Sequence, residues 1–345
     1  MKFYATFDSG MENAAQQEIE KFTGSKVELS QGILTFDLDP KDLGKIIFHV
    51  QSCVRILAAI DSFPSLDNLQ FDFAWENFDT AKTCKVEVEN VKGQENRIEI
   101  ARKVIPSLLA DMKKKSFNPA VDVKDPELVI VVYNSAEKYF FGVDLCGLLN
   151  ERAYRVFPHQ ASFKGDLGYF FISELELKPG EKFVAGFCKD GVIPIEASLS
   201  LNNLPLRKFR SIFPLLQDLQ DSTPLTESQT VFAFDESIQN VTAARKNAKL
   251  AKVPCDIQRY RLEDLDVKYG ENNFEKMILQ ITRKDEDKIN EIYYQISYIL
   301  KQGGKLLLIG RETWELSISE KFKQVKQGQI QRGNSIHHYW LLEKI

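Results

Sequence analysis

The second half of the chain alternates short apolar strands with helical segments, and this alternation limits the fold more than any other feature. Each of three apolar runs is followed by a segment with helical spacing of apolar residues; the runs lie at 183–187, 230–234 and 275–281. Strands that alternate with helices form parallel sheets with right-handed crossovers. The last two runs, 322–329 and 335–343, instead favour an antiparallel hairpin. We therefore predict an α/β domain with a Rossmann-type sheet over 175–345.

The first half of the chain has a different order of elements. Residues 1–64 read as β-α-β-β-α-β, with a glycine-containing turn between the second and third strands. Two helices on one face of a four-stranded antiparallel sheet make a ferredoxin-like domain. Residues 65–150 have the pattern of a second α+β domain, whose long helix spans 96–115. Residues 151–174 are expected to link this part to the Rossmann-type domain.

Composition excludes several classes of protein. The 345 residues carry a net charge of −4, so binding of nucleic acid through bulk charge is not expected, although a local basic surface is still allowed. No apolar run reaches the roughly 18 residues of a membrane span, and the first residues lack the apolar core of a secretory signal. The five cysteines form no CxxC pair, which favours reduced thiols in the cytoplasm. His49 and His159 have no metal-ligand partners at suitable spacing, so no metal site is predicted.

Several motifs follow one another along nearly the whole chain. Residues 3–6 (Phe-Tyr-Ala-Thr) and 10–12 (Gly-Met-Glu) are similar to an F-A-T…G-L-E opening, and 144–155 is similar to D-x-S-G-x-x-L-x-x-R-G-Y-R. Residues 191–197 are similar to the end of D-P-x-C-G-S-G-T-x-x-I-E-A, and 244–248 to A-R-x-N-A. This order resembles the THUMP-domain RNA methyltransferases, which act on the exocyclic N2 of guanine in tRNA or rRNA. The resemblance implies a ferredoxin-like domain, a THUMP domain and a class I methyltransferase domain, with structured RNA as the partner.

The resemblance also implies which residues would bind S-adenosylmethionine. In that family the glycine loop after the first strand holds the methionine part of the cofactor. An acid after the second strand binds the ribose hydroxyls, and an acid after the third strand contacts the adenine amine. The matching positions are Phe187, Gly191, Asp235 and Glu263. Structural roles stay open for three of them: Gly191 suits the entry to a helix, Asp235 suits the N-cap of the next helix, and Glu263 suits a solvated surface.

Two departures from the family's motifs predict weakened chemistry. The first acid of D-P-x-C-G-S-G-T is Ala185 here and its first glycine is Lys189, so we expect weak binding of S-adenosylmethionine. The family's N-P-P-Y, which holds the target amine and stacks on the flipped base, is replaced by residues 280–283. Gln280 keeps an amide oxygen that can accept from an amine, and Arg283 is the candidate to lie against a base. Because methyl transfer depends mainly on positioning, we expect weak or absent catalysis.

Basic residues at two places are candidates for contact with RNA. In THUMP domains the helix that matches 96–115 helps to hold RNA, and two arginines flank Tyr154 in the expected linker. The alternatives are a solvated basic helix end that complements the helix dipole and arginines that fix the linker in place. The candidate RNA-binding residues are Arg102, Lys103, Lys113, Lys114, Lys115, Arg152 and Arg155.

Three functions remain open from the sequence. The first is an RNA-binding, methyltransferase-like protein with weak or absent catalysis, acting as the partner of an active methyltransferase subunit. The second is an active S-adenosylmethionine-dependent RNA (guanine-N2) methyltransferase with a divergent loop around Gln280. The third is a protein-interaction scaffold. RNA binding without cofactor binding would favour the first, both together the second, and neither the third.

Overall fold

The computed structural model describes most of the chain in two compact units. Unit 1 comprises Met1–Asp8, Ala15–Leu149 and Lys208–Ser222, and unit 2 comprises Ser9–Ala14, Asn150–Arg207 and Thr223–Ile345. The described residues are 1–206, 211–217, 219–221, 223–224, 228–281, 285–311, 316–332 and 335–345.

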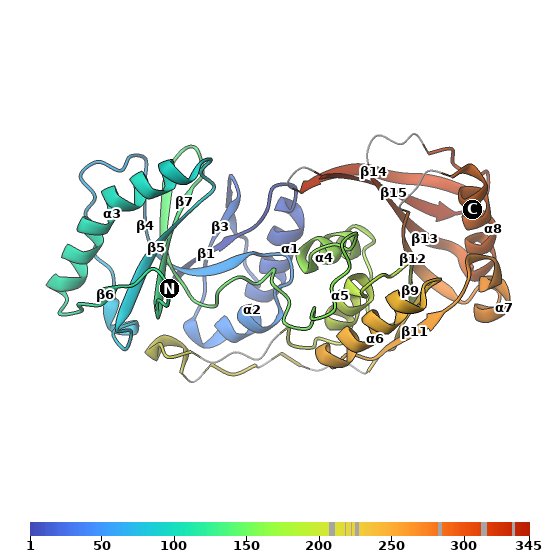
Figure 1. Ribbon diagram of the computed structural model, residues 1–345, viewed down its shortest axis with the longest axis horizontal. Helices are drawn as coiled ribbons and strands as arrows, with labels where there is room; N and C mark the ends of the chain where they lie inside the picture. The colour runs from blue at the N-terminus through green and yellow to red at the C-terminus, as the bar shows by residue number, and fades with distance from the viewer. Residues whose placement is uncertain are drawn as a thin grey trace. The chain divides into compact units, whose positions relative to one another are not determined.

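The first 149 residues form one mixed sheet of eight strands in the order β2-β3-β1-β4-β8-β7-β5-β6 (Figure 1). The elements are β1 (Lys2–Thr6), α1 (Glu12–Thr23), β2 (Glu28–Ser30), β3 (Ile33–Asp37), α2 (Leu43–His49), β4 (Arg55–Phe63), β5 (Thr83–Glu89), α3 (Gln94–Lys114), β6 (Ala120–Val121), β7 (Leu128–Asn134) and β8 (Tyr139–Asp144). The predicted ferredoxin-like order is seen at one end, where β2, β3, β1 and β4 pair antiparallel throughout.

Strand β4 joins the two halves of this sheet. It pairs antiparallel with β1 on one side and with β8 on the other, with Leu57 opposite Asp144. At the start of β4 the guanidinium of Arg55 forms ion pairs with Glu87 and Glu89 of β5 and with Asp144 of β8. The two N-terminal domains expected from the sequence therefore contribute strands to a single continuous sheet.

Unit 2 contains a seven-stranded sheet in the order β11-β10-β9-β12-β13-β15-β14. The first five strands are parallel and the last two form an antiparallel hairpin, which confirms the Rossmann-type sheet predicted from the alternating pattern. Its elements are α4 (Gly165–Glu174), β9 (Phe183–Gly186), α5 (Val192–Leu201), β10 (Val231–Asp235), α6 (Ile238–Ala251), β11 (Cys255–Arg259), α7 (Leu265–Tyr269), β12 (Phe274–Gln280), α8 (Glu286–Ile299), β13 (Leu300–Arg311), β14 (Phe322–Arg332) and β15 (Ser335–Lys344).

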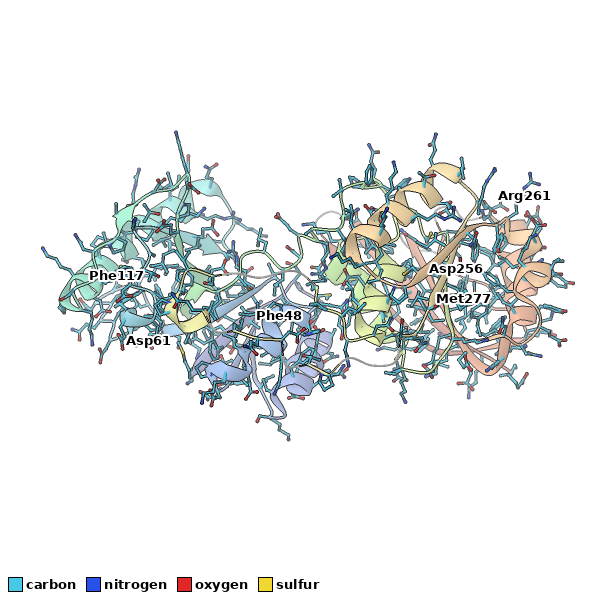
Figure 2. All side chains as sticks on the ribbon, turned by 90° about the horizontal axis from the view of Figure 1, so that it is seen from below. Phe48, Asp61, Phe117, Asp256, Arg261 and Met277 are labelled. Atoms are coloured by element: carbon cyan, nitrogen blue, oxygen red, sulfur yellow. The ribbon has the colours of Figure 1, made fainter. Side chains whose placement is uncertain are left out.

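The core of unit 2 lies on both faces of this sheet. Helices α7 and α8 cover one face, whereas α4, α5 and α6 lie on the other (Figure 1). Met277 of the central strand β12 is fully buried inside the unit (Figure 2). Gly186 ends β9 without a side chain because a Cβ there would lie 2.0 Å from Leu279 and 2.6 Å from Phe234.

For two segments, the local sequence pattern did not indicate the unit to which they belong. Residues 151–174, expected as a linker, are part of unit 2 and contain α4, which packs on α5. The second segment lies near 211–221 and belongs to unit 1, where the Phe213 ring packs 5.1 Å from the Phe78 ring. In the same segment Asp221 lies 2.8 Å from the ring nitrogen of His49. Within the described ranges, no helix is long and apolar enough to cross a membrane.

Candidate functional site

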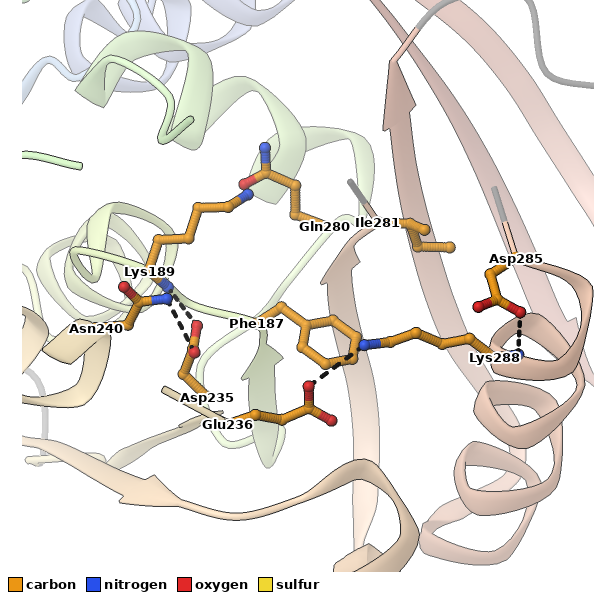
Figure 3. Close-up of a pocket in the computed structure, with 9 residues that line it drawn as sticks. All are labelled: Phe187, Lys189, Asp235, Glu236, Asn240, Gln280, Ile281, Asp285 and Lys288. Carbon is orange, nitrogen blue, oxygen red and sulfur yellow. Dashed lines mark hydrogen bonds and ion pairs between the residues drawn. The ribbon is translucent and has the colours of Figure 1, made fainter. Parts of the chain in front are cut away.

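A cavity of about 360 Å³ opens at the carboxyl ends of β9, β10 and β12 in unit 2 (Figure 3). In open α/β sheets, ligands bind at this edge because the loops that follow the parallel strands meet there. The volume lies within the range of small-molecule sites, roughly 300–1,000 Å³. The lining residues are Phe187, Lys189, Asp235, Glu236, Asn240, Gln280, Ile281, Asp285 and Lys288.

The loop after β9 contributes Phe187 and Lys189 to the pocket lining and contains three residues with positive φ. Phe187 has φ 53°, Lys189 has φ 52° and Gly191 has φ 87°. For a lysine this left-handed conformation costs about 1–2 kcal/mol. The Lys189 side chain is 5% exposed and extends toward Gln280 in Figure 3. A cationic side chain therefore stands in the pocket where the motif of the resembled family has a glycine.

Asp235 ends β10, and both oxygens of its carboxylate are used by the protein. Oδ2 accepts from the backbone N–H of Lys189 at 2.9 Å. Oδ1 accepts from the backbone N–H of Ser237 at 2.9 Å and from the amide of Asn240 at 3.0 Å. Because a carboxylate offers about four acceptor positions, these three bonds leave Asp235 little capacity for a ligand. The helix N-cap itself is Ser237, whose side chain accepts from Asn240.

A charged outer wall faces the aromatic ring of Phe187. Lys288 of α8 lies with its ammonium 4.5 Å from the centre of that ring and 3.3 Å from a carboxylate oxygen of Glu236. Asp285 caps α8 by accepting from the backbone N–H of Lys288. Three residues of this wall were not predicted from the sequence, namely Glu236, Asp285 and Lys288. The signal that could have found Asp285 is its position as an N-cap directly after the motif at 280–283.

Gln280, one of the two predicted catalytic residues, ends β12 and lines the pocket. Its amide nitrogen donates to the carbonyl of Ala161 at 3.0 Å. This bond uses one of the two N–H donors of the amide and fixes its orientation, and the amide oxygen is the acceptor that Gln280 can offer to a ligand. Arg283, the other predicted catalytic residue, lies outside the described residues.

Two of the four predicted cofactor-binding residues line the pocket and two do not. Phe187 and Asp235 are in the lining, whereas Gly191 and Glu263 are not. Gly191 is instead the N-cap of α5, where a Cβ would lie 3.0 Å from Ala244 of α6. Glu263 is exposed in a short 3₁₀ turn after β11. No cluster of His, Cys, Asp and Glu suited to a metal ion occurs in the part of the chain that the structure describes.

Arg152 and Arg155, predicted to contact RNA, are held inside unit 2. The guanidinium of Arg152 makes a bidentate pair with Glu196 at 2.8 and 3.0 Å, and both side chains are almost fully buried. Although burial alone would lower the pKa of Arg152, the Glu196 carboxylate raises it. Tyr154 donates to the same carboxylate at 2.6 Å, and its burial raises the pKa of its hydroxyl. Arg155 pairs with the fully buried Asp190 at 2.9 Å, so this geometry favours fixing of the segment over contact with RNA.

The predicted basic residues of α3 lie on the surface of unit 1. Two of them form exposed ion pairs, Lys103 with Asp67 and Lys115 with Asp72. The carboxylates of these pairs have lowered pKa values because they accept hydrogen bonds from the lysines. The remaining three, Arg102, Lys113 and Lys114, are exposed and form no ion pair with any described residue.

The sheet order and the pocket at its carboxyl edge define unit 2 as a Rossmann-like methyltransferase fold. The whole chain superimposes on TrmN from Thermus thermophilus with a TM-score of 0.73 at 15% identity, covering 100% of this chain and 99% of that one. It also superimposes on SMU.472, complexed with SAH, with a TM-score of 0.72 at 18% identity, covering 99% and 97%.

The chain belongs to the RMKL-like methyltransferase domain family, whose sequence profile matches residues 152–324. It is 24% identical over 282 residues to the tRNA (guanine(6)-N2)-methyltransferase of Methanocaldococcus jannaschii, covering 73% of each chain. It is also 24% identical over 224 residues to the enzyme of the same name from Archaeoglobus fulgidus, covering 61% of this chain and 56% of that one.

Proposed function

We propose that this protein binds structured RNA, tRNA or rRNA, and that its methyltransferase domain is weak or inactive in catalysis. The observation that carries the proposal is the engagement of Asp235. Both its oxygens accept from the protein, through Lys189, Ser237 and Asn240. Relatives named tRNA (guanine(6)-N2)-methyltransferase and the SAH complex of SMU.472 make S-adenosylmethionine the cofactor to test.

The pocket fits that cofactor in position and size but not in its polar groups. Ribose offers two neighbouring hydroxyls, whereas Asp235 has about one acceptor position left. Ala185 removes a second carboxylate from the first strand, and the Lys189 side chain takes up part of the cavity. A positive ammonium in the pocket also opposes binding of a positively charged sulfonium.

We assign RNA binding to unit 1 and treat residues 65–150 as a THUMP domain. Its support is the exposed basic side of α3, where Arg102, Lys113 and Lys114 make no ion pair with a described residue. Lysines and arginines in such positions neutralise phosphates and release counterions. In this proposal the protein acts in the cytoplasm and holds RNA for an active methyltransferase subunit.

One observation favours a second function, an active RNA (guanine-N2) methyltransferase. The amide oxygen of Gln280 lies at the pocket with its nitrogen fixed on Ala161. An acceptor held in this way could orient an exocyclic amine. This function requires Asp235 or Lys189 to move when a ligand enters.

Calorimetric titration of the full chain with S-adenosylmethionine and with S-adenosylhomocysteine separates the two functions. Binding of tRNA and rRNA fragments is measured in parallel. We expect RNA binding together with no heat from either cofactor form at micromolar concentrations. A micromolar dissociation constant, about −8 kcal/mol, followed by methyl transfer to RNA, would establish the second function instead. Absence of RNA binding would overturn both.

A further inference from the structure

The loop that follows Arg155 presents an exposed aromatic ring beside a basic helix of unit 2. Phe157 is 39% exposed and its neighbour Val156 is 58% exposed. The ammonium of Lys246, on α6, lies 4.6 Å from the centre of the Phe157 ring. An exposed aromatic ring with a cation beside it is the arrangement on which nucleic-acid bases stack.

Hydrogen bonds hold this loop in a fixed position. The buried side chain of Asn247 accepts from the Phe157 N–H at 3.1 Å and donates to the Phe157 carbonyl at 3.1 Å. It also donates to the Asp190 carbonyl at 2.9 Å, and the Asp190 carboxylate accepts from Arg155 and from the His159 N–H. The two bonds to Phe157 involve only its backbone N–H and carbonyl, so the side chain takes no part in fixing the loop through them.

The charge of the helix suits a polyanion. Between Ile238 and Ala251, α6 contains Arg245, Lys246 and Lys249 and no acidic residue, although the whole chain has a net charge of −4. Lys246 and Lys249 are exposed and form no ion pair with a described residue. By contrast α8 carries Glu286, Asp287 and Glu291 against a single lysine.

Both parts of this surface lead to the pocket. Asn240, six residues before Lys246 and about 9 Å away along the helix axis, lines the cavity. On the other side, the same loop continues to Ala161, whose carbonyl accepts from the pocket residue Gln280. An RNA strand bound on this surface would therefore pass the opening of the cavity.

We propose that residues 155–159 and α6 form a platform for an unpaired stretch of RNA, on which Phe157 stacks one base and Lys246 and Lys249 neutralise the adjoining phosphates. The inference rests on the proposed RNA binding and adds to it a second contact surface, on unit 2, that is selective for unpaired nucleotides. A protein partner would also cover Val156 and Phe157, but the cations on α6 favour the polyanion.

The experiment measures binding of the full chain to a hairpin RNA with an unpaired loop and to a fully paired RNA duplex. Phe157→Ala should weaken hairpin binding about tenfold and change duplex binding little. Phe157→Tyr should keep the affinity, whereas Phe157→Leu should not, because stacking needs the aromatic face. Lys246→Gln should reduce the slope of log affinity against log salt by about one.

Tyr294 gives a matched control. Its ring on the acidic helix α8 is 54% exposed and has the ammonium of Lys321 5.4 Å from its centre. Tyr294→Ala should leave hairpin binding unchanged. Equal losses in Phe157→Ala and Tyr294→Ala, or unchanged hairpin binding in Phe157→Ala, would overturn the platform and leave the proposed function intact. Failure of the unmodified protein to bind any RNA would instead overturn the proposed function.

Discussion

Lys189 donates its backbone N–H to Oδ2 of Asp235 at 2.9 Å, and this contact ties the loop after β9 to the end of β10. Lys189 has φ 52° and its side chain lines the pocket, while Asp235 also accepts from Ser237 and Asn240. This hydrogen bond therefore links the two features that separate the pocket from an open cofactor site, which are the lysine side chain and the occupied carboxylate.

Replacing Lys189 by glycine should stabilise the protein and open the pocket. Relief of the left-handed strain exceeds the extra chain entropy of glycine, so the free energy of unfolding should rise by about 0.5–1 kcal/mol. Affinity for S-adenosylmethionine should increase about tenfold, equivalent to about 1.4 kcal/mol. Urea unfolding and calorimetric titration measure the two effects.

The matched control for this variant is Lys252→Gly. Lys252 has φ 58° at the end of α6 but does not line the pocket. The control should gain stability and leave cofactor affinity unchanged. Equal cofactor affinities for Lys189→Gly and the unmodified protein would show that the side chain does not limit binding.

Glu196→Gln should be strongly destabilising. The change leaves the buried guanidinium of Arg152 without its counter-charge, and breaking a buried pair in this way costs about 3–5 kcal/mol. The exposed pair of Lys103 and Asp67 provides the comparison, because Asp67→Asn should have no measurable effect on urea unfolding. A loss below about 1 kcal/mol for Glu196→Gln would mean that the pair is not buried in solution.

Glu89→Gln should change how stability depends on pH. Burial raises the pKa of Glu89 above its ordinary value of 4.5, despite the opposing charge of Arg55. A raised pKa in the folded state gives stability that is present below pH 4.5 and is lost as the pH rises through the folded value. The amide can still accept from Arg55 but does not titrate, so the variant should show a smaller fall in unfolding free energy as the pH rises from 4.5. Denaturant midpoints measured across this range that fall equally in both proteins would contradict the assignment.

Lys113→Glu combined with Lys114→Glu should weaken RNA binding. The change reverses two exposed charges on α3, so affinity should fall by at least tenfold at low salt and the salt dependence should become shallower. Lys41→Glu, which reverses an exposed lysine elsewhere in unit 1, is the control. If all variants bind RNA alike in fluorescence anisotropy, α3 does not contact RNA.

Local periodicity was enough to predict most elements of the fold. The alternation after residue 175 predicted the parallel strands and the hairpin of unit 2, and the first 64 residues predicted the order of β1 to β4. The pairing of β4 with β8 could not be predicted, because hydrogen bonding between strands so distant in sequence leaves no periodic signal. The packing of Phe213 on Phe78 could not be predicted either, because it also joins residues distant in sequence.

The sequence indicated which strands contribute residues to the pocket, but not which loop residues line it. Asp235 and Gln280 were expected at strand ends and reach the pocket, since strand ends converge in a parallel sheet. Gly191 and Glu263 do not, because the path of each loop decides where its residues lie. The ion pair of Lys288 with Glu236 joins residues 52 positions apart and needed the structure.

The segment near residues 211–221 limits where the gene could be divided between the two units. Unit 1 is completed by residues encoded after those of α5, because Phe213 covers Phe78 and Asp221 meets His49. A gene cut after residue 149 would leave that surface uncovered and its aromatic contact missing. Recombination at that point would separate Phe213 and Asp221 from Phe78 and His49, so unit 1 is transferred with these contacts only if the later segment goes with it.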